Sequence, residues 1–409
     1  MIRPPSRVSA RRPPVRPGAV RPGRVSPGWP RPAVVVAVAV LVAALVGGCA
    51  SFPDNGPREW RDKSSGGGQL IEPPKIPQEN PESPPPPPPQ PGPPPGQAGG
   101  PVGCTDPDPQ VVATCLSPVS AVAVLPGGQS ALVAERSTGR VLRVEKDKAP
   151  VPIATVPVGG GGGLLGLVLS PTYQDDQLLY AYASTGGDNR VLRISPGDPP
   201  TPVLTGIPKD GSGALGVDRY GALLVATGSG GGADPGPTSL AGKLLRIDTF
   251  GHPFPTNPDP RSPIFSSGLR APGGMCTALD SGAVWITDHL PGRDALRQGT
   301  PGPLGEPAWS WPDRPGVAGC VAPPGAIAVA EGRGAALFLL HTNGPGAFTG
   351  TPQTVLPHVY GQLGPATLGP DGLIWLGTTN KGSGTPTVSS DDRVIRIQPP
   401  SGGGGAGPD

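Results

Sequence analysis

Aromatic residues, histidine and methionine are scarce in this chain of 409 residues. Phe, Trp and Tyr together make up 4% of the sequence, and there are four histidines and two methionines. The five cysteines include no Cys-x-x-Cys pair, so the usual ligand spacing of a zinc site is missing. Beyond residue 48, no cluster of Lys and Arg with interleaved aromatic residues occurs. The sequence therefore argues against a zinc protein and excludes the usual nucleic-acid-binding surfaces.

Long apolar segments are missing as well. The longest apolar run, Ala33–Val46, has 14 residues, which is too short for a comfortable membrane span and typical of a signal-peptide core. Eight arginines and no acidic residue precede it, and it ends in Val46-Gly-Gly-Cys49, which looks like a bacterial lipobox. We therefore predict a lipoprotein signal peptide over residues 1–48 and an acylated Cys49 that holds the protein in membrane lipid, on the extracytoplasmic face of the cell membrane. An ordinary signal anchor with an incidental cysteine is the alternative.

The charge balance depends on this segment. The whole chain has 32 Lys and Arg against 30 Asp and Glu, and removal of residues 1–48 leaves 24 against 30, a net charge of −6. The slightly basic balance of the full chain therefore implies no anionic partner. Residues 49–103 are rich in proline and poor in apolar residues, so we expect an extended, disordered linker. The Gly-rich residues 401–409 are expected to be a disordered tail.

Glycine and proline are abundant, with 66 and 64 copies, and they mark an internal repeat. Six times a turn rich in Pro, Gly or Asp precedes a short β-rich segment. These predicted strands are Ser130–Ala134, Gln177–Tyr182, Ala222–Thr227, Ala283–Asp288, Ala335–Leu340 and Leu373–Thr378. Their spacing of about 37 to 61 residues suits four-stranded propeller blades. The sequence thus predicts an all-β fold, one six-bladed β-propeller over residues 104–400, with any ligand site in the central channel or at its mouth.

Four of the repeats close on a near-identical strand that carries an arginine. These strands are Arg140–Val144, Arg190–Ile194, Lys243–Ile247 and Arg393–Ile397. Because the arginines recur with the blades, we interpret them as structural residues that stack between blades or face solvent. They are Arg143, Arg193, Arg246 and Arg396.

Four cysteines remain once Cys49 is assigned to lipid. An even number of cysteines in an exported domain favours two disulfides, for which three pairings exist. We favour Cys104–Cys115, at the start of the domain, and Cys276–Cys320, which would tie the fourth blade to the fifth.

Several motifs occur in the order found in one known family. They include Gly163-Leu-Leu-Gly-Leu, Gly242-Lys-Leu-Leu-Arg-Ile-Asp248, Ser267-Gly-Leu-Arg-Ala-Pro-Gly-Gly274, Trp285-Ile-Thr-Asp-His-Leu-Pro291 and Gly369-Pro-Asp-Gly372. Through them, residues 115–398 resemble the glucose/sorbosone dehydrogenases, or soluble quinoprotein glucose dehydrogenases. The resemblance implies a six-bladed propeller, whose family members oxidise aldoses with pyrroloquinoline quinone (PQQ) and calcium. With its lipobox and proline-rich linker, the chain also resembles the actinobacterial lipoproteins of the LppZ group.

The resemblance places the catalytic base at Asp210, where the family has histidine. A carboxylate accepts a proton, but an exposed one with a pKa near 4 is a weak base. Asp210 is otherwise an ordinary turn residue. Most positions that hold PQQ in the family have no cationic or amide side chain here that could bind a tricarboxylate. Arg270 is the one family residue of this set that the chain keeps. The replaced positions are Ala271, Gly273, Gln362 and Gly364, with two more at about Gly161 and Asn343. Arg270 either binds an anionic ligand or braces a turn between blades.

Calcium and PQQ are thus implied by resemblance only, and we expect no cofactor. In the family, backbone carbonyls of the turn that matches Leu290 and Pro291 help to hold calcium. Asp288 and Asp294 are the acidic residues near that turn. His289 is a candidate ligand-binding residue, with a packed, hydrogen-bonded histidine as the alternative.

We expect a membrane-anchored envelope lipoprotein whose propeller binds a sugar-like ligand in the channel or a protein partner on one face. A divergent PQQ-dependent aldose dehydrogenase, with Asp210 as base, is the second hypothesis. A metal-dependent, lactonase-like hydrolase is the third, because other six-bladed propellers hold one metal in the channel.

Overall fold

The computed structural model describes residues 104–230, 235–343, 347–383 and 387–400 of the chain. The predicted signal peptide, Cys49, the proline-rich linker and the C-terminal tail lie outside these residues. No helix in the described ranges is long and apolar enough to span a bilayer.

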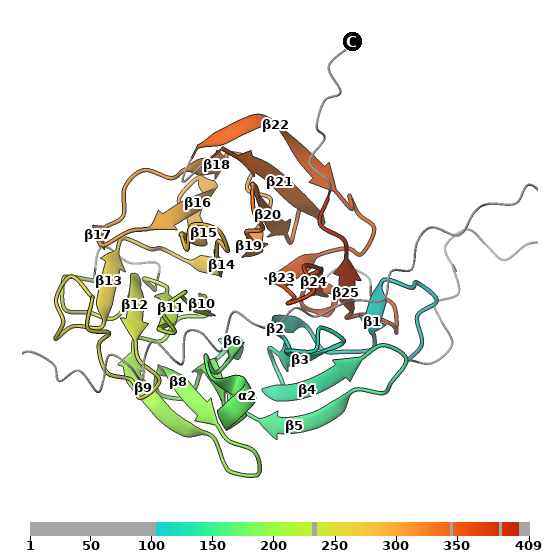
Figure 1. The fold of residues 1–409 in the computed structure, drawn as a ribbon, viewed down its shortest axis with the longest axis horizontal. Coiled ribbons are helices and arrows are strands. Elements are labelled where there is room, and N and C mark those ends of the chain that lie inside the picture. The colour runs from blue at the N-terminus through green and yellow to red at the C-terminus, as the bar shows by residue number, and fades with distance from the viewer. Residues whose placement is uncertain (1–103, 231–234, 344–346, 384–386, 401–409) are drawn as a thin grey trace, which may run out of the picture. The chain divides into compact units, whose positions relative to one another are not determined.

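Six sheets surround a central axis, and each sheet is one blade (Figure 1). Blade 1 consists of β2 (Val119–Val124), β3 (Ser130–Glu135), β4 (Arg140–Glu145) and β5 (Val151–Thr155). Blade 2 consists of β6 (Leu164–Leu169), β7 (Leu179–Ser184), β8 (Asn189–Ile194) and β9 (Thr201–Ile207). Blade 3 consists of β10 (Gly213–Val217), β11 (Leu223–Thr227), β12 (Lys243–Ile247), β13 (Ile264–Ser267) and the short β17 (Gly302–Pro303), which pairs with β13 in parallel. Apart from this pair, neighbouring strands are antiparallel.

Blade 4 consists of β14 (Pro272–Thr277), β15 (Val284–Leu290), β16 (Arg293–Gly299) and β18 (Trp309–Trp311). Blade 5 consists of β19 (Val317–Val321), β20 (Ala326–Glu331), β21 (Ala336–Thr342) and β22 (Phe348–Val355). Blade 6 consists of β23 (Leu363–Leu368), β24 (Ile374–Thr378), β25 (Val394–Ile397) and β1 (Val111–Ala113). The described helices are short: α2 (Tyr173–Asp176) and the 3₁₀ helix η1 (Asn380–Gly382). The predicted six-bladed propeller is confirmed.

The second and third strands of the blades form where the sequence has short apolar runs. The residues of β3, β11 and β24 are all buried. Such strands have a neighbouring blade on both faces, so they carry apolar residues in succession rather than in alternation. Six apolar clusters result, one at each interface between neighbouring blades. The core of this protein is therefore a ring of interfaces.

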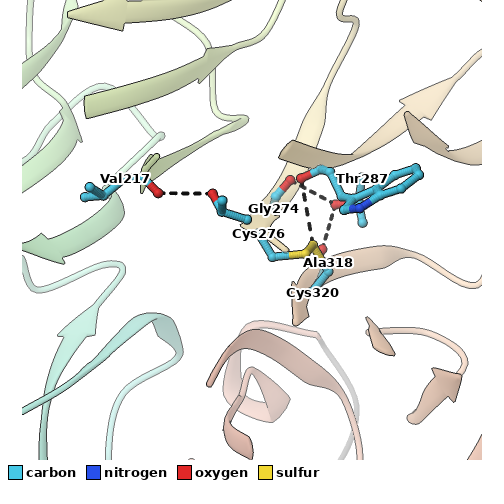
Figure 2. The surroundings of a disulfide bond; sticks show 8 residues. Val217, Gly274, Cys276, Thr287, Ala318 and Cys320 are labelled. Carbon is cyan, nitrogen blue, oxygen red and sulfur yellow. Dashed lines mark hydrogen bonds between the residues drawn. A yellow bond between two sulfur atoms is a disulfide. The ribbon is translucent and has the colours of Figure 1, made fainter. Parts of the chain in front are cut away.

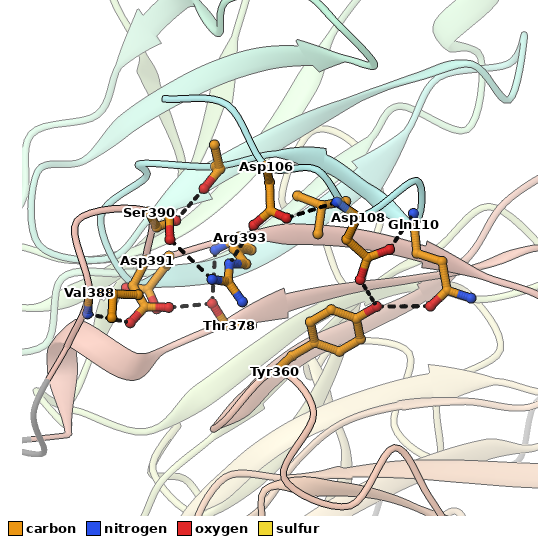
Figure 3. A network of polar contacts seen from close by, with 12 residues as sticks. Asp106, Asp108, Gln110, Tyr360, Thr378, Val388, Ser390, Asp391 and Arg393 are labelled. Atoms are coloured by element: carbon orange, nitrogen blue, oxygen red, sulfur yellow. Dashed lines mark hydrogen bonds and ion pairs between the residues drawn. The ribbon is translucent and has the colours of Figure 1, made fainter. Parts of the chain in front are cut away.

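The ring closes where the first strand joins the last blade. β1 pairs with β25, and Val111 lies opposite Ile395. Figure 3 shows the polar contacts that support this closure. The Tyr360 hydroxyl lies 2.7 Å from the Asp108 carboxylate, and Arg393 Nε lies 3.0 Å from Asp106 Oδ2. Residues more than 250 positions apart in the sequence thus form hydrogen bonds with each other.

The Cys276–Cys320 disulfide is confirmed, and it joins β14 of blade 4 to β19 of blade 5. Figure 2 shows that the same interface holds the Thr287 hydroxyl, which donates to the Ala318 carbonyl at 2.6 Å. The predicted Cys104–Cys115 disulfide is wrong for this structure, in which the two sulfurs are not bonded. Burial and a hydrogen bond between these two side chains raise the pKa of the Cys115 thiol to about 11. At such a pKa little reactive thiolate forms at neutral pH.

The structural interpretation of the repeated arginines is confirmed for two of them. Arg246 forms a buried ion pair with Asp218 at 2.7 Å and lies over the Phe254 ring, 4.2 Å from its centroid. Arg396 lies over the Trp375 ring at 5.5 Å. Both side chains pack within the blade system and away from the axis.

Candidate functional site

The central feature of the molecule is an axial cavity of about 710 Å³. It is lined by the innermost strand of every blade, namely β2, β6, β10, β14, β19 and β23, which meet at the centre of Figure 1. These strands approach one another closely where they carry glycine. A Cβ at Gly274 would lie 2.6 Å from the Ala318 carbonyl oxygen, and one at Gly319 would lie 2.2 Å from the Ala366 amide nitrogen. Glycine is therefore what allows the six strands to converge.

Each innermost strand pairs with a neighbour on one side only, because it stands at the end of its sheet. Its other edge faces the axis. The backbone N–H and C=O groups along such an edge have no partner strand, so they offer hydrogen bonds to whatever fills the space. The side chains between them are mostly small and apolar, including Ala121, Ala214 and Ala318. The cavity wall thus alternates backbone polar groups with small apolar surfaces.

His289 stands on this wall, next to a buried carboxylate. It lies near the end of β15, and its Nδ1 is 2.8 Å from Asp294 Oδ1 on β16. The second oxygen of Asp294 accepts hydrogen bonds from the backbone N–H groups of Gly316 and Val317 in blade 5. The Asp294 side chain is fully buried, while the imidazole is 33% exposed. The carboxylate therefore fixes the ring orientation and leaves the other ring nitrogen for a ligand.

Two arginines, Arg136 and Arg333, add positive charge to the cavity wall. Each donates a hydrogen bond to a backbone carbonyl, Arg136 to Gly211 and Arg333 to Arg314. Burial lowers the pKa of the Arg136 guanidinium, which still stays charged at neutral pH. Among the described residues that line the cavity, none is Asp or Glu. The charge of the wall is therefore positive.

A buried acid lies behind the wall in blade 5. Glu331, the last residue of β20, is 6% exposed, and no hydrogen bond to its carboxylate is formed within the described ranges. Burial and the nearby Asp313 and Asp294 raise the pKa of Glu331 to about 7. The corresponding residue of blade 1, Glu135, has a pKa that is shifted in the opposite direction. Glu135 ends β3, and hydrogen bonds from Arg140, Ser117 and Thr138 outweigh the effect of burial and lower its pKa.

Asp210 does not line the axial cavity. Its Oδ1 accepts hydrogen bonds from the Ser212 backbone and hydroxyl, and its Oδ2 accepts one from the Gly230 N–H at 2.7 Å. The carboxylate therefore stabilises the loop that follows β11, which is the role of a turn residue.

The other predicted site residues lie around the turn between β15 and β16 and the segment before β14. The backbone N–H groups of Arg270 and Ala271 donate to the buried Asp288 carboxylate, which is also 3.6 Å from Arg297. Burial raises the pKa of Asp288 despite these contacts. Leu290 and Pro291 lie at the tight turn, where Leu290 pairs with Arg293. Of the predicted residues with a ligand-binding or catalytic role, the structure brings only His289 to the cavity.

Both carboxylates near this turn already have protein partners. Asp288 and Asp294 are both fully buried and accept backbone hydrogen bonds. Within the described ranges, no group of three or more His, Cys, Asp or Glu residues is placed to hold a metal ion.

Arg136 and Arg333 were not predicted from the sequence, although the repeat contains a signal for Arg136. In three blades the second strand reaches a buried polar residue, and the next residue lines the cavity. These pairs are Glu135–Arg136, Asp288–His289 and Thr378–Thr379. In blade 5, Glu331 is followed by Gly332 and Arg333, which both line it. Alignment of the repeats at this position would have identified the cavity wall.

Comparisons with known proteins agree with this architecture. The family model for glucose/sorbosone dehydrogenases matches residues 116–303. The curated aldose sugar dehydrogenase YliI of Escherichia coli K12 is 28% identical over 202 residues, which cover 42% of this chain. The match spans 53% of that relative, about half its length.

Two solved structures are similar over almost their whole length. The PQQ-bound form of an aldose sugar dehydrogenase from Streptomyces coelicolor is 29% identical, with a TM-score of 0.65, and the alignment covers 70% of this chain and 96% of that one. A structure from Thermus thermophilus, described as a putative oxidoreductase (glucose dehydrogenase), is 30% identical, with a TM-score of 0.64 and coverage of 70% and 98%.

Proposed function

Because the chain belongs to the glucose/sorbosone dehydrogenase family, we propose that it uses the family's propeller to bind a sugar-like ligand in the axial cavity without oxidising it. The observation that carries this proposal is the cavity wall itself. Six unpaired strand edges, His289 and two arginines offer hydrogen bonds around a space of about 710 Å³. A polyhydroxylated ring can satisfy many such groups at once, and its C–H faces can pack on the alanines and leucines between them.

The residues present do not fit PQQ. A planar tricarboxylate needs cations and amide donors aimed at its oxygens. Of the positions that resemblance assigns to PQQ contacts, only Gln362 both lines the cavity and has a polar side chain. A Cβ at Gly273 would lie 2.3 Å from the Val317 carbonyl oxygen, and one at Gly364 would lie 2.7 Å from the Thr379 methyl group. A longer donor side chain at Gly273 would therefore require blades 4 and 5 to separate, and one at Gly364 would require the Thr379 side chain of the same blade to move.

We place this binding function at the outer face of the cell membrane. The support comes from sequence: the lipobox-like segment that ends in Cys49 and the proline-rich residues 49–103. Acylation of Cys49 would anchor the chain in membrane lipid, and the linker would let the propeller sample the envelope around it. Globomycin sensitivity of the precursor and mass spectrometry of the mature N-terminus test this placement. An unmodified Cys49 would contradict it.

The test of function is calorimetry with the full-length protein in detergent. We expect saturable binding of at least one sugar from a panel of neutral and acidic mono- and oligosaccharides. We expect no binding of PQQ, with or without calcium, and no dye reduction with any aldose. Substitution of His289 by Ala should weaken sugar binding about tenfold, as expected for the loss of one well-placed hydrogen bond in an enclosed site. A protein that binds no sugar would contradict the proposal.

A divergent PQQ-dependent aldose dehydrogenase is the second candidate function. It is favoured by the similarity to a structure described as PQQ-bound. Micromolar binding of PQQ together with dye reduction in the presence of an aldose would replace the first proposal with this one.

A further inference from the structure

A second cavity, of about 390 Å³, lies beside the axial one between blades 5 and 6. We call it the side pocket. Its wall comes from the turn after β20, from the loop before β23 and from four residues between β24 and β25, namely Asn380, Val388, Asp391 and Arg393. Arg333 and Gln362 line both cavities. The two cavities therefore share this part of their walls, which we call the junction.

The far wall of the side pocket is held in place by hydrogen bonds. The Asn380 amide donates to the Tyr360 carbonyl at 2.9 Å and to Asp391 Oδ1 at 3.0 Å, and Asp391 also accepts a hydrogen bond from the Val388 N–H. Arg393 contacts Asp106 and Ser390, as Figure 3 shows. Part of the pocket wall thus belongs to the same network that closes the ring.

Two polar side chains at the junction of the two cavities have few hydrogen-bond partners within the described ranges. The Gln362 side chain makes no hydrogen bond within the described ranges, although its backbone N–H donates to Asn380 at 2.7 Å. Arg333 is exposed and has a single backbone carbonyl as partner. An amide and a guanidinium side by side can donate several hydrogen bonds to one oxygen-rich group.

Arg333, at the junction, has no ion-pair partner within the described ranges. Arg393 has Asp106 as its ion-pair partner, and Asp391 is the one acidic residue among the described residues that line either cavity. Arg136 and Arg333 contact only backbone carbonyl oxygens. A negatively charged group of a ligand would therefore be attracted to Arg333 at the junction.

We propose that the axial cavity and the side pocket form one continuous site for an acidic oligosaccharide. One sugar residue occupies the axial cavity, a second occupies the side pocket, and the acid group of the ligand lies at Arg333 and Gln362. This inference rests on the proposed sugar-binding function and adds to it the length and the charge of the ligand. Neither property follows from the axial cavity alone.

The experiment compares galacturonic acid, tetragalacturonate, glucose and maltotetraose by calorimetry with the full-length protein in detergent. We expect tetragalacturonate to bind at least about tenfold more tightly than galacturonic acid, since a second residue reaches the side pocket, and more tightly than maltotetraose. Arg333→Gln should weaken tetragalacturonate binding about tenfold or more and change maltotetraose binding less than about twofold. Arg333→Lys should restore part of the loss, because it keeps the charge.

Arg261→Gln is the matched control, because the Arg261 side chain is 92% exposed and lies outside both cavities. It should leave all affinities unchanged. Gln362→Ala should reduce the advantage of the tetramer over the monomer. If neutral and acidic sugars bind equally well and Arg333→Gln has no effect, the inference is wrong while the sugar-binding function stands. If no sugar binds, both are wrong.

Discussion

Replacing Glu331 by glutamine should stabilise the folded propeller at alkaline pH and leave it nearly unchanged at acidic pH. The carboxyl is 6% exposed, and its charged form has no hydrogen-bond donor within the described ranges. Burial, Asp313 and Asp294 all disfavour that charged form and raise the pKa to about 7, from an ordinary value of 4.5. The native state therefore holds this proton more tightly than the unfolded chain does.

The sign and size of the effect follow from proton linkage. Between pH 4.5 and about pH 7 the folded protein binds more protons at this site than the unfolded chain, so the contribution of Glu331 to stability falls as the pH rises. Above about pH 7 this contribution of Glu331 to the free energy of unfolding is fully lost. A shift of this size corresponds to about 3 kcal/mol, since one pKa unit is worth about 1.4 kcal/mol. Glutamine has no charge to bury, so the variant should recover most of that amount at pH 8.

Urea denaturation at pH 5 and pH 8 measures this difference, and Glu135→Gln is the matched control. Glu135 occupies the same place in blade 1, but its hydrogen bonds with Arg140, Ser117 and Thr138 lower its pKa. Its stabilising contribution is present at pH 8 and is lost as the pH falls, so Glu135→Gln should destabilise the protein at pH 8. A Glu331→Gln variant that is less stable than wild type at pH 8, or that shows the same difference at both pH values, would refute the reasoning.

Three further substitutions test the packing between and within blades. Replacing Cys276 and Cys320 together by serine should cost about 4 kcal/mol in urea denaturation, as loop entropy predicts for a separation of 44 residues; a loss below about 1 kcal/mol would contradict this. Asp218→Ala should lower the unfolding free energy by about 3–5 kcal/mol, because it leaves the buried Arg246 without its partner; thermal melting at neutral pH checks this. Gly319→Ala should cost about 1–3 kcal/mol, because its Cβ would collide with the backbone of blade 6, and an unchanged melting temperature would show that the blades can separate freely.

Much of the fold could be predicted from sequence because each blade is a local unit. The apolar runs at Ser130–Ala134 and Leu373–Thr378 became β3 and β24, and the repeated turns set their spacing. The Cys276–Cys320 pairing could be anticipated because blades 4 and 5 are neighbours once the ring is assumed. The side chains of Cys104 and Cys115 also lie close together, as predicted, but they form a hydrogen bond and not a disulfide.

The candidate site was harder to predict. Resemblance pointed to Asp210 and Arg270, but neither side chain lines the axial cavity, and Asp210 is turned toward Ser212 and Gly230. Arg136 could be found only by aligning the blades at the buried polar residue that ends the second strand, because the family motifs do not include this position. Arg136 lines the axial cavity because it lies in the turn between β3 and β4, at the end of β3.

The architecture follows from the amino-acid pattern alone, since repeated apolar strands joined by glycine-rich turns can bury their surfaces by packing blade against blade around a ring. The side chains that reach the axis could be identified in the folded chain alone, because they depend on the register and approach of six innermost strands from distant parts of the sequence. Folding also brings Ser117, Thr138 and Arg140 to the Glu135 carboxyl as hydrogen-bond donors, whereas it brings the acidic Asp313 and Asp294 close to Glu331.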